Sequence, residues 1–534
     1  MIRDRLGFAR GKASTGDSRQ IIANTLSAWA GAATSGLIGF FLVPLLLLRV
    51  GKEGYGLTTL VGTIVGLTVL VDLGLRGALG RHLTEHVAKR DERAFNELAS
   101  SALLVYLLIA SVCAGVCVTL AVPIVRAFRV PAELAPAGVF LIRWYSSSMI
   151  VLGFVGPVFS STIIALGRYD LLNIVGVLVA VVRGAGLVVA VWFLKGGLYG
   201  WAIVSLSACA LGVIGNAAVA FHYWPSFRLR AGSIRTRALR PLFSLGGSLF
   251  TIQASMVVGT QSDPIVLTAF LGPAAVALYS PALSLVSLFR PVISALSDQL
   301  SPFATVHHVM GNRARLQGLL IRGTRLTLLM GILAFVILGI FANPIMRVWL
   351  ERSLEAEYSI VARVLTIWAV TDLGMYAIGT QWAVLLAMTR LSLIVWVSVI
   401  LAAANVLLSI YLVGYTRLGV VGVVIPTALQ RLLTWLIITP YTARLSGLTL
   451  REYFVASHAQ PLVVGVLLSG AAFGLRTALP PGNTMELLTD CGLIALIWVG
   501  LSWQFGLTSE ERSACLTWTR SCFRNAREAV VPVT

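Results

Sequence analysis

The sequence predicts an all-α polytopic membrane protein with about fourteen transmembrane helices, built as two parallel six-helix repeats followed by two C-terminal helices. Three observations lead to this fold class. The 534-residue chain is 57% hydrophobic and 12% charged, whereas roughly a quarter of residues in soluble proteins are charged. Its apolar runs are close to the roughly 20 residues that cross a bilayer. Short segments of the first half also recur in the second half at one nearly constant spacing.

The apolar runs define the expected spans. They lie at 22–48, 57–79, 99–121, 137–164, 171–194, 198–222, 243–271, 275–297, 324–346, 360–387, 391–413, 419–440, 460–479 and 487–507. Each copy of the repeat then contains an even number of crossings. Both copies therefore run the same way through the bilayer, which is the plan of a parallel-repeat transporter.

The repeat itself is clearest in one pair of motifs. PIVRAF, from Pro123 to Phe128, is echoed by PIMRVW, from Pro344 to Trp349, and 344 − 123 is 221. Further pairs are separated by 221 or 222 residues: Gly51 and Gly272, His86 and His308, Arg93 and Arg315, Arg168 and Arg390, and Gly197 and Gly419. A Tyr follows each glycine of the first pair, at Tyr55 and Tyr279.

Charge predicts the topology. The net charge of +19 would suit nucleic acid, but membrane proteins concentrate Lys and Arg in cytoplasmic loops, so we expect no nucleic-acid partner. The basic residues cluster in alternate loops and place both termini in the cytoplasm. The expected division is a cytoplasmic tail at 1–20, an N-lobe at 21–223, a basic cytoplasmic linker at 224–241, a C-lobe at 242–445, helices thirteen and fourteen at 446–508, and a basic cytoplasmic tail at 509–534.

Motifs for metals and nucleotides are missing from the sequence. The six cysteines form no CxxC pair, and His82 and His86 have a metal-compatible spacing without a convincing third ligand. No GxxxxGK[ST] motif occurs, so ATP is not expected as the direct energy source. We expect no metal site and no cofactor, although H⁺ or Na⁺ is a candidate coupling ion.

Several motifs together resemble one transporter family. They are VGKEGYG from Val50, VDLGLRGALGRHLTEHVAKRD from Val71 to Asp91, ALGRYDLLN from Ala165 to Asn173, and DPIVLTAFLGPAAVALYSPA from Asp263 to Ala282. In this order they are similar to the polysaccharide transporter branch of the multidrug/oligosaccharidyl-lipid/polysaccharide exporter superfamily, which includes Wzx-type O-antigen flippases. The resemblance implies a MATE-like fold of two six-helix bundles around a central cavity. It also implies a short glycan on a polyprenyl diphosphate as substrate, a polysaccharide polymerase or assembly machinery as partner, and the bacterial inner membrane as location.

Four arginines lie inside the expected spans: Arg143, Arg183, Arg290 and Arg431. An ionisable side chain at membrane depth costs roughly 2.5–3.5 kcal/mol and therefore usually faces a wet cavity or a partner. Guanidinium groups suit phosphate oxygens, so these arginines are candidate ligands of a diphosphate headgroup. The alternative is a structural role, and Arg143 in particular lies near a helix end from which it can snorkel. Arg290 also precedes Pro291, which predicts either a gating bend or an ordinary packing kink.

Three acidic residues in the spans are candidates for ion coupling or charge pairing: Asp72, Asp263 and Asp372. Asp72 has Arg76 one turn away, which favours a structural pair. Asp263 precedes Pro264, where the helix is expected to break. Asp372 has no basic residue within a turn and is therefore the preferred coupling candidate.

These observations predict a lipid-linked oligosaccharide flippase that works by alternating access, with a cationic cavity for its anionic substrate. A lipid II flippase remains an alternative because it shares the plan and the cationic cavity. A drug antiporter of the same fold is disfavoured by the excess of intramembrane arginine. A glycan polymerase or glycosyltransferase is disfavoured because no large loop with convergent carboxylates is visible.

Overall fold

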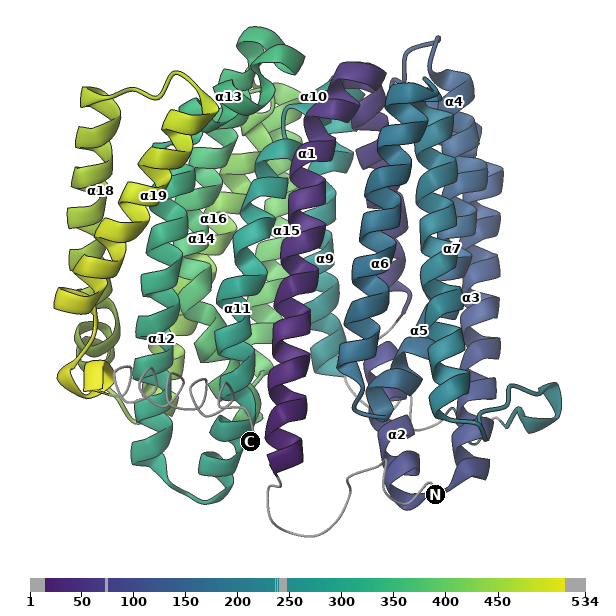
Figure 1. Cartoon of the computed structure of the whole chain (residues 1–534), viewed down its shortest axis with the longest axis horizontal. Helices are drawn as coiled ribbons and strands as arrows, with labels where there is room; N and C mark the ends of the chain where they lie inside the picture. Colours follow the sequence, from purple (N-terminus) through teal and green to yellow (C-terminus); the bar gives the residue numbers. More distant parts are fainter. Residues whose placement is uncertain (1–14, 73–74, 236, 238, 240–246, 514–534) are drawn as a thin grey trace, which may run out of the picture. The chain divides into compact units, whose positions relative to one another are not determined.

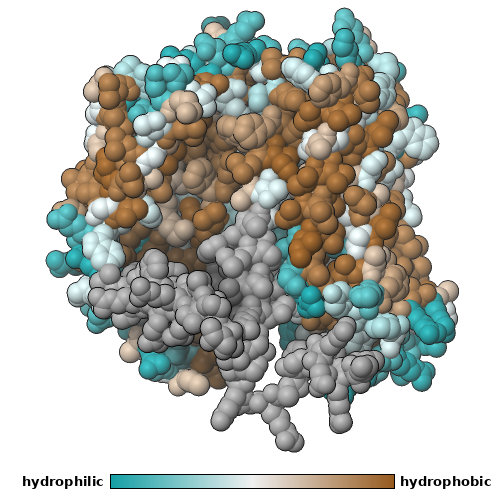
Figure 2. All heavy atoms as spheres, in the orientation of Figure 1, coloured by the Kyte–Doolittle hydropathy of each residue, from teal (hydrophilic) through white to brown (hydrophobic). Residues whose placement is uncertain are grey.

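The computed structural model describes residues 15–72, 75–235, 237, 239 and 247–513. Within these residues every regular element is a helix (Figure 1). The predicted all-α class is therefore confirmed. On the part of the face that Figure 2 shows in colour, hydrophobic side chains cover the middle of the helices and hydrophilic ones gather towards their ends, which fits a protein that crosses a membrane.

The chain divides into two compact units. Unit 1 comprises Met1–Pro291, Leu350–Val361 and Ser392–Thr427, and unit 2 comprises Val292–Trp349, Ala362–Leu391 and Ala428–Thr534. One division falls directly after Pro291, inside a continuous helix. The lobe boundaries expected from the sequence stay a prediction.

Unit 1 contains the helices of the first half together with α9, α10 and α15. Its elements are α1 (Thr15–Leu67), η1 (Thr68–Leu70), α2 (Leu75–Lys89), α3 (Glu92–Ala127), α4 (Ala135–Phe140), η2 (Leu141–Ser146), α5 (Ser147–Ala165), α6 (Tyr169–Leu187), η3 (Val188–Phe193), α7 (Gly197–Tyr223), η4 (Ala231–Ser233), α9 (Gly247–Leu271), α10 (Pro273–Ala277), η6 (Glu355–Glu357) and α15 (Ser392–Tyr415). Helix α6 packs against α1 and α7, and α5 packs against α3 and α7 (Figure 1).

Unit 2 contains most of the helices that follow α11. Its elements are α12 (Arg313–Phe335), η5 (Val336–Ile340), α17 (Leu450–Phe454), η7 (Val455–Ala459), α18 (Gln460–Ala478), α19 (Thr484–Leu501) and η8 (Ser502–Gly506). Four helices contribute residues to both units: α11 (Ser280–Val309), α13 (Ala342–Leu354), α14 (Tyr358–Ala387) and α16 (Val421–Leu445). The C-terminal pair α18 and α19 packs together, and α18 lies against α12 (Figure 1).

Twelve helical stretches among the described residues are long and apolar enough to cross a membrane, so the expected count of fourteen is not confirmed. The expected spans 22–48 and 57–79 are joined into one stretch, Ala33–Leu70, and its helical path stops well before residue 79. The expected span 243–271 corresponds to α9, which is not among the twelve. Polar residues such as Gln261 and Asp263 interrupt its apolar sequence.

The internal repeat is confirmed in the local backbone. Four pairs of residues with positive φ are separated by the repeat spacing: Gly51 and Gly272 (272 − 51 = 221), Arg90 and Gly311 (311 − 90 = 221), Gly167 and Thr389 (389 − 167 = 222), and Gly197 and Gly419 (419 − 197 = 222). At the first pair the angles nearly coincide, with φ 74° and ψ 175° at Gly51 and φ 85° and ψ 173° at Gly272. Glycine permits this backbone without strain, and it turns the chain between two helices in each copy.

A second correspondence concerns helix starts. The side chain of Asp91 accepts a hydrogen bond from the backbone N–H of Ala94, and that of Asn312 accepts one from Arg315, and 312 − 91 is 221. Such N-caps satisfy backbone donors that the first helical turn leaves without partners. Helix α3 of the first copy and helix α12 of the second copy therefore begin with the same kind of N-cap.

The two copies also touch inside unit 1. A Cβ on Gly56, at the end of VGKEGYG, would lie 1.8 Å from the carbonyl oxygen of Pro273, in the matching motif of the second copy. Only glycine allows so close an approach of two backbones. The first motif of the chain is thus explained by packing against its own repeat.

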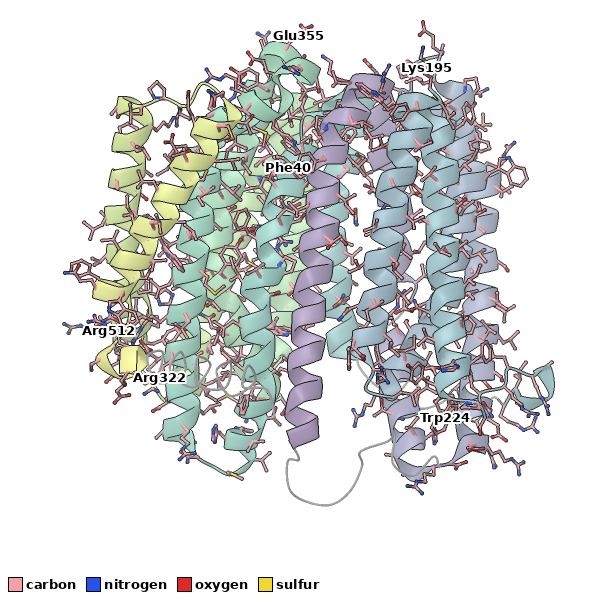
Figure 3. All side chains as sticks on the ribbon, in the orientation of Figure 1. Phe40, Lys195, Trp224, Arg322, Glu355 and Arg512 are labelled. Atoms are coloured by element: carbon pink, nitrogen blue, oxygen red, sulfur yellow. The ribbon has the colours of Figure 1, made fainter. Side chains whose placement is uncertain are left out.

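The C-terminal helices are tied to the rest of unit 2 by buried polar contacts. The Tyr453 hydroxyl lies 2.8 Å from Thr324 Oγ1 and accepts from Gln381 Nε2 at 3.2 Å. Arg325, only 6% exposed, pairs with Glu511 at 3.1 Å and donates to the carbonyl of Ala456. In Figure 3 the labelled Arg322 and Arg512 of this unit lie at one end of its helices.

Candidate functional site

A deeply buried charge pair joins α14 to α16. The guanidinium of Arg431 forms an ion pair with Asp372, whose side chain is 2% exposed. Arg431 also lies over the ring of Trp368, 4.0 Å from its centroid, in a cation–π contact. Trp368 and Asp372 are four residues apart on α14 and so present one face to the arginine.

This pair changes how the two residues are interpreted. Asp372 was the preferred coupling candidate because its own helix supplies no base, but Arg431 approaches it from another helix. Periodicity within one helix contains no information about such a partner. The geometry favours the charge-pairing role for Asp372, whose carboxylate neutralises the guanidinium of Arg431. The predicted roles of Asp372 in ion coupling and of Arg431 in substrate binding stay predictions.

A second buried acid, Asp263 on α9, is surrounded by hydroxyl groups. Its Oδ2 accepts a hydrogen bond from the Tyr279 hydroxyl at 2.8 Å and from Thr427 Oγ1 at 2.9 Å. Asn405 Nδ2 donates to the same threonine oxygen at 2.9 Å. The Asp263 side chain is 0% exposed.

The sequence explains how this Asp263 cluster, formed by Asp263, Tyr279, Asn405 and Thr427, comes together. Asp263 lies within α9, Tyr279 follows the short α10 behind the Gly272 turn, and α15 packs along α9. In the first copy Pro44 matches Pro264 (264 − 44 = 220), but the residue before it is Val43. The acid is therefore a feature of one copy only.

All four members of the Asp263 cluster offer oxygen atoms. Oxygen ligands are what hard cations such as Na⁺ and Ca²⁺ prefer, and a carboxylate can alternatively take a proton. Asn405 Oδ1 is buried and has no hydrogen-bond partner within the described part of the chain. Ser409, one turn later on α15, is 0% exposed and its Oγ is likewise without a partner there. The cluster thus has spare buried acceptor capacity.

Asp72 has a structural environment. It lies between η1 and α2, and its carboxylate accepts from the backbone N–H of Arg76 at 3.4 Å. The Arg76 guanidinium instead donates to the carbonyl of Gly153 at 3.3 Å. The expected contact between these two residues exists as a hydrogen bond from the backbone of Arg76 to the carboxylate of Asp72.

Arg143 and Arg183 occupy different depths. Arg143 lies in η2, eight residues into the stretch Ala135–Ala165, and its Nε donates to the carbonyl of Val118 at 3.2 Å. Arg183 lies within two residues of the centre of the stretch Tyr169–Phe193, and its side chain is exposed on α6. No carboxylate of the described residues forms an ion pair with Arg183. Arg143 therefore has the environment of a structural residue, and Arg183 that of an available cation.

Arg290 is exposed on α11 directly before Pro291. The helix continues through this proline to Val309, so Pro291 does not end it. The path of the backbone favours neither a gating bend nor an ordinary packing kink at Pro291.

The histidines of α2 lie beside an exposed ion pair. His82 Nδ1 lies 3.4 Å from Glu85, which also pairs with Lys89. The Lys89 ammonium and the His82 hydrogen bond lower the pKa of Glu85, and burial lowers the pKa of His86. Within the described residues no three side chains of His, Cys, Asp or Glu are close enough to hold a metal ion.

The structure thus brings together Asp372 and Arg431, two residues that the sequence analysis considered separately. It surrounds a third, Asp263, with residues that sequence reasoning missed: Tyr279, Asn405 and Thr427. Trp368 was also missed. Polar residues inside otherwise apolar spans were the available signal, because a buried hydroxyl or amide requires a hydrogen-bond partner.

Comparisons with known proteins agree with this architecture. The family described as "Polysaccharide biosynthesis protein" matches residues 21–302, which is more than half of the chain. A relative, the uncharacterized membrane protein EpsK of Bacillus subtilis (strain 168), is 24% identical over 509 residues, covering 92% of this chain and 96% of the relative.

Solved structures show the same fold. The lipid II flippase MurJ, in an inward closed conformation, has a TM-score of 0.65 and 14% identity, covering 91% of this chain and 98% of its own. A multidrug resistance MATE transporter in an inward-facing conformation has a TM-score of 0.63 and 14% identity, covering 84% and 98%. The MATE-like fold is confirmed.

Proposed function

Because the chain belongs to the polysaccharide biosynthesis protein family, we propose that it is a flippase that moves a polyprenyl-diphosphate-linked oligosaccharide across the bacterial cytoplasmic membrane by alternating access. The protein is a multi-pass membrane protein with the MATE-like fold. Its substrate would be the repeat unit of a cell-surface polysaccharide. A polymerase or assembly machinery would take over the glycan on the outer side. It would act as a transporter and not as an enzyme.

The observation that supports this proposal most is the position of Arg183. It lies two residues, about 3 Å along the helix axis, from the centre of its span. An unpaired guanidinium at that depth would cost roughly 2.5–3.5 kcal/mol against lipid, so we place it on a water-accessible surface. A guanidinium can bind phosphate oxygens through two parallel, charge-assisted hydrogen bonds. A diphosphate crossing the membrane needs such a partner.

The other three arginines differ in how well their contacts suit substrate binding. Arg290 and Arg431 remain candidate substrate ligands, but Arg431 would have to exchange Asp372 for the diphosphate during the cycle. Arg143 is the weakest candidate, because its guanidinium already donates a hydrogen bond to the backbone carbonyl of Val118.

The Asp263 cluster is our candidate for ion coupling. A buried carboxylate that accepts from two hydroxyl groups, beside spare amide and hydroxyl oxygens, offers a hard-cation or proton site. The coupling ion would be H⁺ or Na⁺. Occupation of this site in one state and release in the other would bias the alternation between them.

The experiment is translocation of a fluorescent polyprenyl-diphosphate oligosaccharide in proteoliposomes, read by quenching of the outer leaflet. The variants are Arg183→Ala, Arg290→Ala and Arg431→Ala, each checked for folding by size exclusion. Arg417→Ala, an exposed arginine outside the candidate spans, is the matched control. We expect translocation by the wild type and the control, and loss in Arg183→Ala. Translocation that is absent in the wild type, or unaffected by Arg183→Ala, would contradict the proposal.

A further inference from the structure

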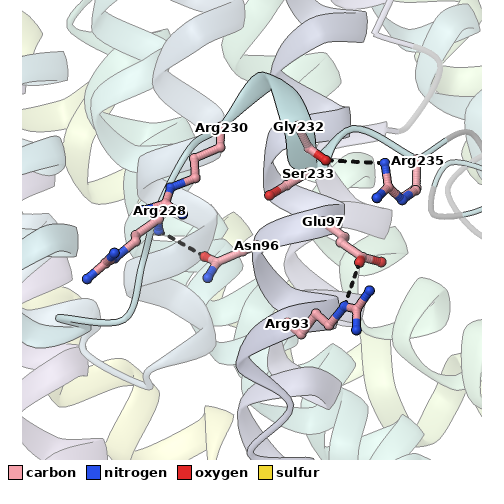
Figure 4. A pocket seen from close by; sticks show the side chains of 8 residues that line it. All are labelled: Arg93, Asn96, Glu97, Arg228, Arg230, Gly232, Ser233 and Arg235. Atoms are coloured by element: carbon pink, nitrogen blue, oxygen red, sulfur yellow. Dashed lines mark hydrogen bonds and ion pairs between the residues drawn. The ribbon is translucent and has the colours of Figure 1, made fainter.

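A cavity of about 240 Å³ lies where the segment after α7 crosses the start of α3 (Figure 4). Its lining belongs entirely to unit 1: Arg93, Asn96, Glu97, Arg228, Arg230, Gly232, Ser233 and Arg235. The lining thus contains four arginines and one carboxylate. We call this cavity the linker pocket. None of its residues belongs to the sites described above.

The segment that forms the linker pocket is held in place by one face of α3. Asn96 Nδ2 donates to the carbonyl of Ser226 at 2.8 Å, and Asn96 Oδ1 accepts from the backbone N–H of Arg228 at 2.9 Å. Ser100 Oγ accepts from the backbone N–H of Arg230 at 3.2 Å, and Ser101 Oγ from that of Arg235 at 2.9 Å. Backbone bonds therefore fix the segment and leave its arginine side chains for other partners.

Aromatic packing also holds the same segment. Phe227, 2% exposed, stacks on Phe221 with ring centroids 4.9 Å apart and meets Phe95 edge-on at 5.7 Å. The linker pocket is therefore part of a rigid structure rather than an incidental gap beside a loop.

The guanidinium groups of the linker pocket are only partly used. Arg93 pairs with Glu97 at 3.1 Å, and Nη1 of Arg235 donates to the carbonyl of Gly232 (Figure 4). The same nitrogen donates to the carbonyl of Ile234. The side chains of Arg228 and Arg230 are exposed and donate to no acceptor within the described residues. A guanidinium has five N–H donors, so most donors here remain available to an anion.

Size and position restrict the ligand. Pockets that enclose a small molecule usually measure about 300–1,000 Å³, so the linker pocket suits a headgroup rather than a whole oligosaccharide. It lies next to the end of α7, where Phe221 and Tyr223 are 43% and 41% exposed, and the labelled Trp224 lies at the end of unit 1 opposite Lys195 and Glu355 (Figure 3). Exposed aromatic residues beside a basic cluster are typical of the interface between a bilayer and water.

We propose that the linker pocket binds the phosphate of an anionic phospholipid headgroup at the membrane surface. The alternative source of the same chemistry is free phosphate from solution. The lipid is favoured because the aromatic residues adjoin the pocket and because the segment belongs to the basic linker that the sequence places on the cytoplasmic side. Binding of this lipid is independent of the transported substrate. It would hold the segment between the two copies of the repeat against the membrane.

The test measures binding of short-chain phosphatidylglycerol to the full detergent-purified chain by thermophoresis. Separate titrations use short-chain phosphatidylcholine and inorganic phosphate. The variant Arg228→Gln, Arg230→Gln, Arg235→Gln removes three of the four arginines. The matched control Arg313→Gln, Arg315→Gln, Arg390→Gln removes three exposed arginines that the sequence also places on the cytoplasmic side. The single variant Arg228→Gln serves if the triple variant does not fold.

Each basic residue near an anionic surface contributes roughly a factor of five to binding, so the pocket variant should bind phosphatidylglycerol about 100-fold more weakly than the wild type. Arg228→Gln should lose about five-fold, and the control should bind like the wild type. Equal binding by the wild type and the pocket variant would overturn the proposal. So would equal losses in pocket variant and control, equal affinity for phosphatidylcholine, or inorganic phosphate binding as tightly as the lipid.

Discussion

Removal of one partner from the Asp372–Arg431 pair should destabilise the protein far more than removal of both. Asp372 is 2% exposed and the arginine side chain 11%, so Asp372→Asn leaves a cation buried without its counter-charge. Breaking a buried pair in this way typically costs about 3–5 kcal/mol, whereas replacing both members by neutral residues is often close to neutral. We expect a strong loss for Asp372→Asn and substantial recovery in Asp372→Asn with Arg431→Met. The contact with Trp368 adds about 0.5–2 kcal/mol to the loss when the arginine alone is removed.

The assay is the apparent melting temperature in detergent, followed by fluorescence-detected size exclusion. Glu357→Gln is the matched control, because it removes a carboxylate from the exposed pair with Lys52, where the side chains are 43% and 37% exposed. An exposed pair contributes about 0–1 kcal/mol, so the control should melt like the wild type. The reasoning is refuted if Asp372→Asn melts like Glu357→Gln, or if the double variant loses the sum of both single losses.

Three further predictions follow from other contacts. Gly56→Ala should lower the melting temperature strongly, because its Cβ would lie 1.8 Å from the Pro273 carbonyl oxygen and the two backbones would have to separate. The control is Gly62→Ala, where a Cβ meets nothing within 4 Å. Equal melting temperatures of the two variants would contradict the packing argument. Asp263→Asn should fold normally but make translocation in proteoliposomes insensitive to Na⁺ and pH gradients; an unchanged gradient dependence would exclude this residue from coupling. Arg325→Met should leave the buried Glu511 without its counter-charge and speed proteolytic cleavage of the C-terminal helices. An unchanged cleavage rate would show that this ion pair does not hold these helices in place.

Much of the fold was predictable because a repeat and a hydrophobic span are local features. The shared positive φ at Gly51 and Gly272 follows from a residue type that tolerates that backbone, and the motif around each glycine was visible in the sequence. The count of spans was less predictable. The helix expected at 57–79 ends at Leu70, and a separate helix, α2, begins at Leu75, a break that average hydropathy does not reveal.

The candidate site was predictable only in part. Buried charges could be recognised one by one, because each is costly at membrane depth. Their partners could not, since Arg431 reaches Asp372 from a helix about 60 residues away and Tyr279 reaches Asp263 across a turn. In uniformly apolar helices the hydrophobic pattern does not reveal which face meets which neighbour.

The acid of the Asp263 cluster is absent from the matching position of the first copy, where Val43 stands, although the turns that frame it are repeated. A repeated scaffold with an unrepeated charge gives the two copies different chemistry. This is the arrangement that a transporter needs if one copy is to respond to an ion.

The most direct test of the central claim compares four cargoes in one batch of proteoliposomes. They are a polyprenyl-diphosphate oligosaccharide, the same lipid without sugar, lipid II and an organic cation. We predict the fastest initial rate for the lipid-linked oligosaccharide, with a much slower rate in Arg183→Ala and no transport of the cation. Transport of the organic cation alone, or a rate for lipid II that exceeds the rate for the oligosaccharide, would contradict the account.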